Sequence, residues 1–215
     1  MLMFYALPDF TYFSSGTGSS YLVTFLVLTF ITKRAIYPFS PWLPMAIAAP
    51  TPISALVHYS TLVTAGLYFM IRYRYVLYSS PQIMKYLFIA SLFTSFYAGV
   101  NTMFEVDLKK LIALSTLSHL GFIGIAFSIG LLYLRFFHLL VHALFKSLLF
   151  ITIGDIMINL NHSQDARYLS RGALYTPFSC FLIRVSLVNL LGLPSLRGFF
   201  SKDLVLETMS FSNVS

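Results

Sequence analysis

The sequence predicts an all-α protein, a polytopic transmembrane helix bundle, and three observations support this fold class. Hydrophobic residues make up 58% of the 215 residues and charged residues only 10%, whereas a soluble domain carries about 25% charged residues. The mean hydropathy is +0.80. Long stretches contain no charged residue, as membrane spans require. This composition excludes an intrinsically disordered chain, a disulfide-rich secreted scaffold and an ordinary soluble enzyme.

The predicted helices follow the apolar stretches, because about 20 apolar residues are needed to cross the hydrocarbon core. No Asp, Glu, Lys or Arg lies between Arg34 and Arg72, between Lys85 and Glu105, or between Lys110 and Arg135. We expect about six spans, at residues 17–39, 50–73, 84–104, 108–130, 132–158 and 174–199, and then a short helix that starts near Ser201. Residues 1–215 are thus interpreted as a single membrane domain.

Two of the helices are expected to be broken by glycine and proline. The first apolar stretch reaches Lys33 and then meets Pro38, so its helix should end just past the lysine. The last stretch meets Gly192 and Pro194 before it reaches Lys202. Two interrupted segments, each with a lysine beside the break, are typical of ion sites in transporters. A lysine that extends from a helix end to the membrane interface is the other interpretation of Lys33.

The remaining segments are interpreted as connections outside the membrane. Residues 159–175 form the longest polar stretch and read as an extramembrane loop. Residues 105–110 form a mixed-charge turn before a helix. The basic residues do not indicate an orientation, because Arg72, Arg74, Lys85 and Arg135 fall on one side and Lys109, Lys110, Arg167 and Arg171 on the other. Asp9 precedes the first apolar stretch, which argues against a signal peptide.

The most informative residues are His138, His142 and Lys146, which are spaced four residues apart. On one helix they form a stripe about 12 Å long on nearly the same face. A charge near the bilayer centre costs roughly 2.5–3.5 kcal/mol, so such residues usually face a protein interior or a wetted path. Neutral imidazole both donates and accepts a proton, and the stripe therefore predicts a proton relay. The alternative is a set of hydrogen bonds that join helices.

Other ionisable residues give weaker signals. His58 lies in a span rich in hydroxyl-bearing residues, and His119 is a further possible relay member to which the sequence gives less support. Asp203 could pair with a neighbouring cation or cap the next helix. No residue set suggests a metal, cofactor or catalytic site, and Cys180 is the only cysteine. The net charge of +7 forms no patch, so nucleic acid is not an expected partner.

Several motifs resemble one family of membrane proteins. Residues 40–66 (SPWLPMAIAAPTPISALVHYSTLVTAG) are very similar to the core of the antiporter-like membrane subunits of respiratory NADH–quinone oxidoreductase, or complex I. Residues 138–150 (HLLVHALFKSLLF) and 198–203 (GFFSKD) resemble the subunit 5 branch. Residues 107–118 and 165–167 fit as well. The resemblance covers residues 25–207, and the composition resembles that of a mitochondrially encoded member.

The resemblance implies a proton-translocating subunit that does no redox chemistry itself. The family's lysine on the first broken helix matches Lys33, and its connecting histidine matches His58. Its relay matches His138, His142 and Lys146, and the lysine of its second broken helix matches Lys202 with Asp203 beside it. NADH, FMN, iron–sulfur clusters and ubiquinone are implied elsewhere in the complex. The implied partners are other complex I membrane subunits and lipid, in the mitochondrial inner membrane.

The sequence also departs from the family pattern. Family members usually have small or polar residues after the first lysine, whereas Arg34 and Ile36 stand there in this sequence. The family also has a glutamate on an earlier helix and further helices at both ends, so we interpret this sequence as part of a longer one. Two alternatives stay open: a subunit of a multisubunit Na⁺/H⁺ antiporter, which shares this core, and a piece whose only role is packing.

Overall fold

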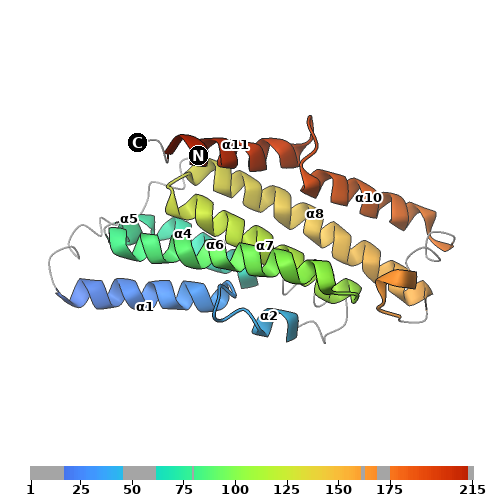
Figure 1. Ribbon diagram of the computed structural model, residues 1–215, viewed down its shortest axis with the longest axis horizontal. Helices are drawn as coiled ribbons and strands as arrows, with labels where there is room; N and C mark the ends of the chain where they lie inside the picture. The colour runs from blue at the N-terminus through green and yellow to red at the C-terminus, as the bar shows by residue number, and fades with distance from the viewer. Residues whose placement is uncertain (1–16, 46–61, 79, 161–162, 169–174, 213–215) are drawn as a thin grey trace.

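The protein is an elongated bundle of α-helices whose long axes run in similar directions (Figure 1). The computed structural model describes residues 17–45, 62–78, 80–160, 163–168 and 175–212. Its helices are α1 (Thr17–Lys33), α2 (Trp42–Met45), α4 (Leu62–Arg72), α5 (Arg74–Tyr78), α6 (Pro81–Phe104), α7 (Leu108–Ser128), α8 (Leu132–Asn159), the 3-10 helix η5 (Ala166–Tyr168), α10 (Pro177–Leu191) and α11 (Arg197–Ser212). Within these ranges the one isolated bridge joins Asp107 and Asp165, so the predicted all-α class is confirmed.

The long helices α6, α7 and α8 form the centre of the bundle. Helices α1, α4 and α5 lie on one side of this centre, and α10 and α11 run end to end along α8 on the other side (Figure 1). Helix α7 packs against both α6 and α8 and has the largest buried share of the three. Any polar side chain that α7 and α8 direct toward each other is therefore shielded from lipid.

The predicted spans 84–104, 108–130 and 132–158 correspond closely to α6, α7 and α8. In the described part of the chain, these helices are long and apolar enough to cross a membrane. The two spans predicted to be broken appear as shorter apolar helices, Val23–Lys33 and Pro177–Leu191. The predicted span 50–73 is described only from Leu62 onward. The chain is thus a multi-pass membrane protein, while the number of six spans stays a prediction.

Both predicted helix breaks are present. Helix α1 ends at Lys33, and Ala35 adopts a left-handed backbone with φ 55° shortly before Pro38, so the helix stops short of the predicted end at residue 39. Helix α10 ends at Leu191, where Gly192 is left-handed with φ 80°. Glycine carries no Cβ penalty in that conformation and commonly terminates helices. The next helix begins at Arg197, somewhat before the predicted start near Ser201.

The polar segment after α8 is tied to the start of α7 by backbone hydrogen bonds. The Leu108 amide donates to the Gln164 carbonyl over 2.9 Å, and the Ala166 amide donates to the Val106 carbonyl over 3.0 Å. At the same end, the Lys110 ammonium lies 2.8 Å from the Asp107 carboxylate. The two backbone hydrogen bonds hold the segment after α8 against the start of α7, outside the apolar part of the pair.

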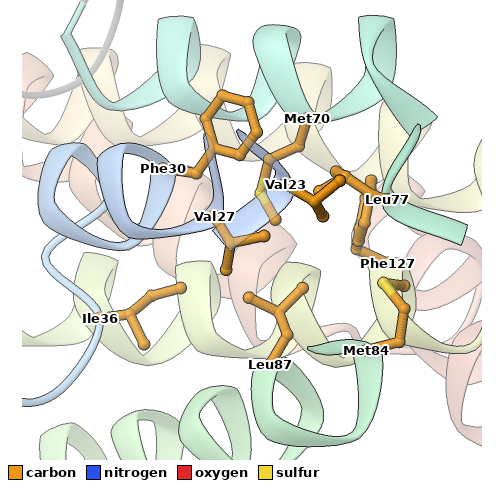
Figure 2. Close-up of a cluster of buried hydrophobic side chains, with 9 residues drawn as sticks. All are labelled: Val23, Val27, Phe30, Ile36, Met70, Leu77, Met84, Leu87 and Phe127. Atoms are coloured by element: carbon orange, nitrogen blue, oxygen red, sulfur yellow. The ribbon is translucent and has the colours of Figure 1, made fainter. Parts of the chain in front are cut away.

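A buried apolar cluster holds the first part of the chain against the centre. It combines side chains from α1, the segment after it, α4, α5, α6 and α7 (Figure 2). Its members are Val23, Val27, Phe30, Ile36, Met70, Leu77, Met84, Leu87 and Phe127. Because lipid is as apolar as these side chains, the cluster stabilises the bundle by close packing more than by removing apolar surface from water.

Helices α6 and α7 approach each other at two glycines of α7. A Cβ built on Gly121 would lie 2.8 Å from the Ser95 amide nitrogen and 2.9 Å from the Ser91 carbonyl oxygen. A Cβ on Gly124 would lie 2.5 Å from the Ser91 hydroxyl. Small residues at such positions let two membrane helices approach backbone to backbone. The α6–α7 contact therefore depends on the absence of side chains at Gly121 and Gly124.

Replacing Gly121 with alanine should destabilise the bundle by about 1–3 kcal/mol, the usual cost of overpacking. The added methyl group would meet backbone atoms of α6, which cannot rotate away. Gly99→Ala is the matched control, because a Cβ there meets nothing within 4 Å and alanine favours the helix by about 0.5–1 kcal/mol. Thermal unfolding of the full-length chain in detergent measures both variants. Equal midpoints for the two variants would contradict this account of the contact.

Candidate functional site

A row of three ionisable side chains lies buried along α8. His138 and His142 are each 4% exposed and Lys146 is 3% exposed. Their spacing of four residues places them on one side of the helix, while Leu140 and Leu144 on other sides remain exposed. The predicted stripe therefore faces the neighbouring helices and not the outer surface.

Lys146 reaches across to α7. Its Nζ donates a hydrogen bond of 2.5 Å to the Ser115 hydroxyl, and that hydroxyl donates 2.7 Å to the Ile112 carbonyl of its own helix. A buried ammonium without such partners would be strongly disfavoured. Ser115 thus fixes the end of the lysine side chain between α7 and α8.

His138 is tied to the second broken helix. Its Nδ1 lies 2.9 Å from the Ser201 hydroxyl of α11, and that hydroxyl donates to the Gly198 carbonyl over 3.1 Å. Since the hydroxyl proton is used in this way, the Ser201 oxygen accepts from a protonated Nδ1. The neutral His138 ring then presents an unprotonated Nε2. That atom is buried without a hydrogen-bond partner among the described residues, as is Nε2 of His142.

A third histidine, His119 of α7, lies against both α8 histidines. Its ring centroid is 5.8 Å from that of His138 and 5.2 Å from that of His142. The sequence supports His119 less than the three residues of the stripe on α8. The available signal was its spacing of four residues from Ser115, which matches the spacing of His142 from Lys146. The two pairs lie opposite each other across the α7–α8 contact.

At the first break, the buried cation is Arg34, and the predicted Lys33 is exposed. The Lys33 ammonium lies 5.5 Å from the centroid of the Phe69 ring, on the side of α4. Arg34 is fully buried, and its Nη2 donates 2.7 Å to the Leu120 carbonyl of α7 while Nη1 lies 3.1 Å from Met70 Sδ. Arginine stays protonated in proteins. The first break therefore holds a permanent charge beside α7.

The other predicted residues differ in their surroundings. Lys202 and Asp203 follow Ser201 in α11 and are half-buried. The charge of Lys202 is close enough to act electrostatically on His138 and His119. His58 lies outside the described residues. The structure thus brings His138, His142, Lys146 and Lys202 into one region, whereas Lys33 lies on α1, with α6 and α7 between it and α8 (Figure 1).

The polar groups also show what chemistry the site can support. No group of three His, Cys, Asp or Glu side chains in the described ranges has the arrangement of metal ligands. The row instead contains nitrogen groups that can exchange protons, with a serine hydroxyl that both donates and accepts at each end. The arrangement is suited to moving or holding a proton along the α7–α8 contact.

Comparison with known proteins places these features in a family. The family described as "NADH:quinone oxidoreductase/Mrp antiporter, TM" matches residues 2–214. NADH-ubiquinone oxidoreductase chain 5 of Aedes aegypti is 50% identical over 187 residues, which cover 87% of this chain and 32% of that protein. The Locusta migratoria chain 5 is 48% identical over 211 residues, which cover 95% of this chain and 36% of that protein.

Structural comparison gives the same result. A chain in the structure of the Mrp complex from Dietzia sp. DQ12-45-1b has a TM-score of 0.81 and 30% identity, and the match covers 92% of this chain and 22% of that one. The chain spans about a third of the length of the curated relatives it matches. The family indicated by the motifs at residues 40–66, 138–150 and 198–203 is confirmed. This chain belongs to the NADH:quinone oxidoreductase/Mrp antiporter family of membrane proteins.

Proposed function

We propose that this chain is part of chain 5 of NADH–ubiquinone oxidoreductase and carries protons across the membrane through its buried Lys/His row. The observation that carries the proposal is the buried row itself, within a membrane-spanning bundle: His138 is bonded to Ser201 at one end, Lys146 is bonded to Ser115 at the other, and His142 lies between them with its ring 6.4 Å from that of His138. Intramembrane ionisable residues that persist despite their cost usually mark a proton path. One feature goes beyond the prediction from the sequence: a serine hydroxyl of another helix is hydrogen-bonded to each end of the row.

The charge of a nearby lysine can control when a histidine of the row takes up a proton. Lys202 lies close enough to affect His138, so a proton leaving Lys202 would make it easier for His138 to accept one. Like charges at short range in a medium of low dielectric constant repel strongly. Lys202 is therefore proposed as a switching charge, with Asp203 as a counter-charge beside it, while the role of Lys33 as the other switching charge stays a prediction. The role of His58 as connecting residue stays a prediction.

The redox chemistry belongs elsewhere in the proposed complex. The described residues supply proton-exchanging groups, so NADH, FMN, iron–sulfur clusters and ubiquinone would be bound by other subunits. The outer faces of α6 and α10 carry large exposed apolar side chains, such as Tyr86, Phe96 and Phe181. Such faces suit other membrane subunits and lipid as partners. The proposed location is the mitochondrial inner membrane.

A subunit of a multisubunit Na⁺/H⁺ antiporter is the second candidate. The TM-score of 0.81 with a chain of an Mrp complex favours it. Identity favours complex I, since it is 50% with chain 5 of Aedes aegypti and 30% with that Mrp-complex chain. The two candidates share the proton path and differ in what drives it.

Replacing Lys146 with methionine should abolish the proton translocation that depends on this chain while the complex still assembles. Methionine keeps the length of the side chain and removes the titratable group, and apolar replacement of a buried charge is often neutral for stability. The variant is made in the full-length chain, and protons moved per NADH oxidised are measured in proteoliposomes. Lys85→Met, an exposed lysine at the start of α6, is the control. If Lys146→Met pumps like the control, the chain has a packing role and the relay is wrong.

The two candidate functions differ in what drives proton movement, and an experiment can distinguish them. For the complex I subunit, NADH and ubiquinone should drive proton uptake into vesicles that lack any sodium gradient. For the antiporter subunit, an imposed sodium gradient should drive proton flux without NADH. Both measurements use the assembled complex with pH-sensitive dye in the lumen. Sodium-driven flux that is lost in Lys146→Met would overturn the complex I assignment and keep the proton path.

A further inference from the structure

The two histidines of α8 leave a gap in the proposed path. Their ring centroids are 6.4 Å apart, and the Nε2 atom of each is buried without a hydrogen-bond partner among the described residues. Proton transfer needs donor and acceptor atoms within about 2.6–3.2 Å, or one water between them. With their ring centroids this far apart, the two histidines are not in direct hydrogen-bond contact.

His119 occupies the position between them on the opposite helix. Its ring is 5.8 Å from His138 and 5.2 Å from His142, so both separations are shorter than the direct one. The charges of Lys146 and Lys202 also act on His119. The three rings form a triangle at the α7–α8 contact, and Phe122 covers one side with its ring 5.4 Å from His138.

We propose that His119 is a proton-carrying residue of this path, which crosses from α8 to α7 and back. This inference rests on the proposed function. Charged His138 releases the proton on Nε2, and an unprotonated nitrogen of His119 accepts it, directly or through one water. His119 then releases the proton on its other nitrogen to Nε2 of His142. His138 ends in the tautomer it started from, whereas His119 ends with its proton on the opposite nitrogen, and rotation of the His119 ring restores its starting tautomer.

A purely structural role for His119 would require different properties of the side chain at this position. If the ring only joined α7 to α8 by hydrogen bonds, any neutral donor and acceptor of similar size would serve. The glutamine amide offers both groups but does not titrate. A proton carrier must instead gain and lose a proton at every passage. Glutamine and leucine at residue 119 therefore separate the two roles.

The test compares four variants of the full-length chain in the assembled complex: His119→Gln, His119→Leu, Lys146→Met and Thr116→Val. Thr116 is a buried residue of α7 whose hydroxyl bonds to its own helix, at the Ala113 carbonyl, so its replacement is the control. Protons moved per NADH oxidised are measured in proteoliposomes, and the amount of assembled complex is measured by native electrophoresis. The initial rate of proton uptake is also recorded from pH 6 to pH 8, a range of roughly two units around the ordinary histidine value.

The inference expects His119→Gln to assemble normally and to lose proton translocation as fully as Lys146→Met does, so that its rate of proton uptake stays at background from pH 6 to pH 8. Thr116→Val should behave like the unmodified chain. Normal pumping by His119→Gln alongside a defective His119→Leu would assign His119 a packing role and overturn the inference, although Lys146→Met would still support the path. Normal pumping by all four variants would overturn both the inference and the proposed function.

Discussion

The low polarity of the membrane interior is the constraint on which this structure depends, because every buried charge must find a partner within the bundle. Helix α7 supplies the partner for two of them. Its Ser115 hydroxyl accepts from Lys146, and its Leu120 carbonyl accepts from Arg34. The helix that satisfies these cations is also the most shielded of the long helices, and its close contact with α6 depends on Gly121 and Gly124. The same helix thus supplies partners for the buried charges and packs tightly against its neighbour.

The two cations that α7 holds differ in their chemistry. Arg34 keeps its charge at all physiological pH values, whereas a lysine ammonium can lose its proton in a suitable environment. Helix α7 therefore has a permanent positive charge on the side of α1 and α4, and exchangeable groups on the side of α8. Since Leu120 is the residue after His119, the permanent charge is bound to the backbone beside the histidine triangle. A fixed charge in this place disfavours further positive charge nearby. Arg34, at the first break, therefore contributes to the electrostatics of the proposed path, even though Lys33 itself is exposed.

Much of the fold could be predicted because it depends on local patterns. The lengths of the apolar stretches predicted α6, α7 and α8 to within about three residues at each end. Proline and glycine predicted both helix breaks. The four-residue spacing of the ionisable residues predicted the buried face of α8. The features that sequence reasoning missed depend on how helices are rotated and aligned. The burial of Arg34 in place of Lys33 depends on the turn of the chain after α1, where helical periodicity no longer applies. His119 gains its neighbours only from the alignment of α7 with α8. Ser115 and Ser201 could not be distinguished in the sequence from the many serines that bond only to their own helix.

The second break has a further consequence for the proposed proton path. A Cβ built on Gly198 would lie 1.7 Å from the Asn189 carbonyl oxygen, so α11 fits against the end of α10 only because residue 198 has no side chain. This fit sets where Ser201 lies, and Ser201 in turn holds Nδ1 of His138. A ring held in this way cannot rotate, so Nε2 stays the nitrogen at which His138 takes up and releases a proton. Movement of α11 about the break would release the ring and shift the charge of Lys202 at the same time. The broken helix is therefore positioned to couple a change of shape to proton uptake by the first histidine in the row.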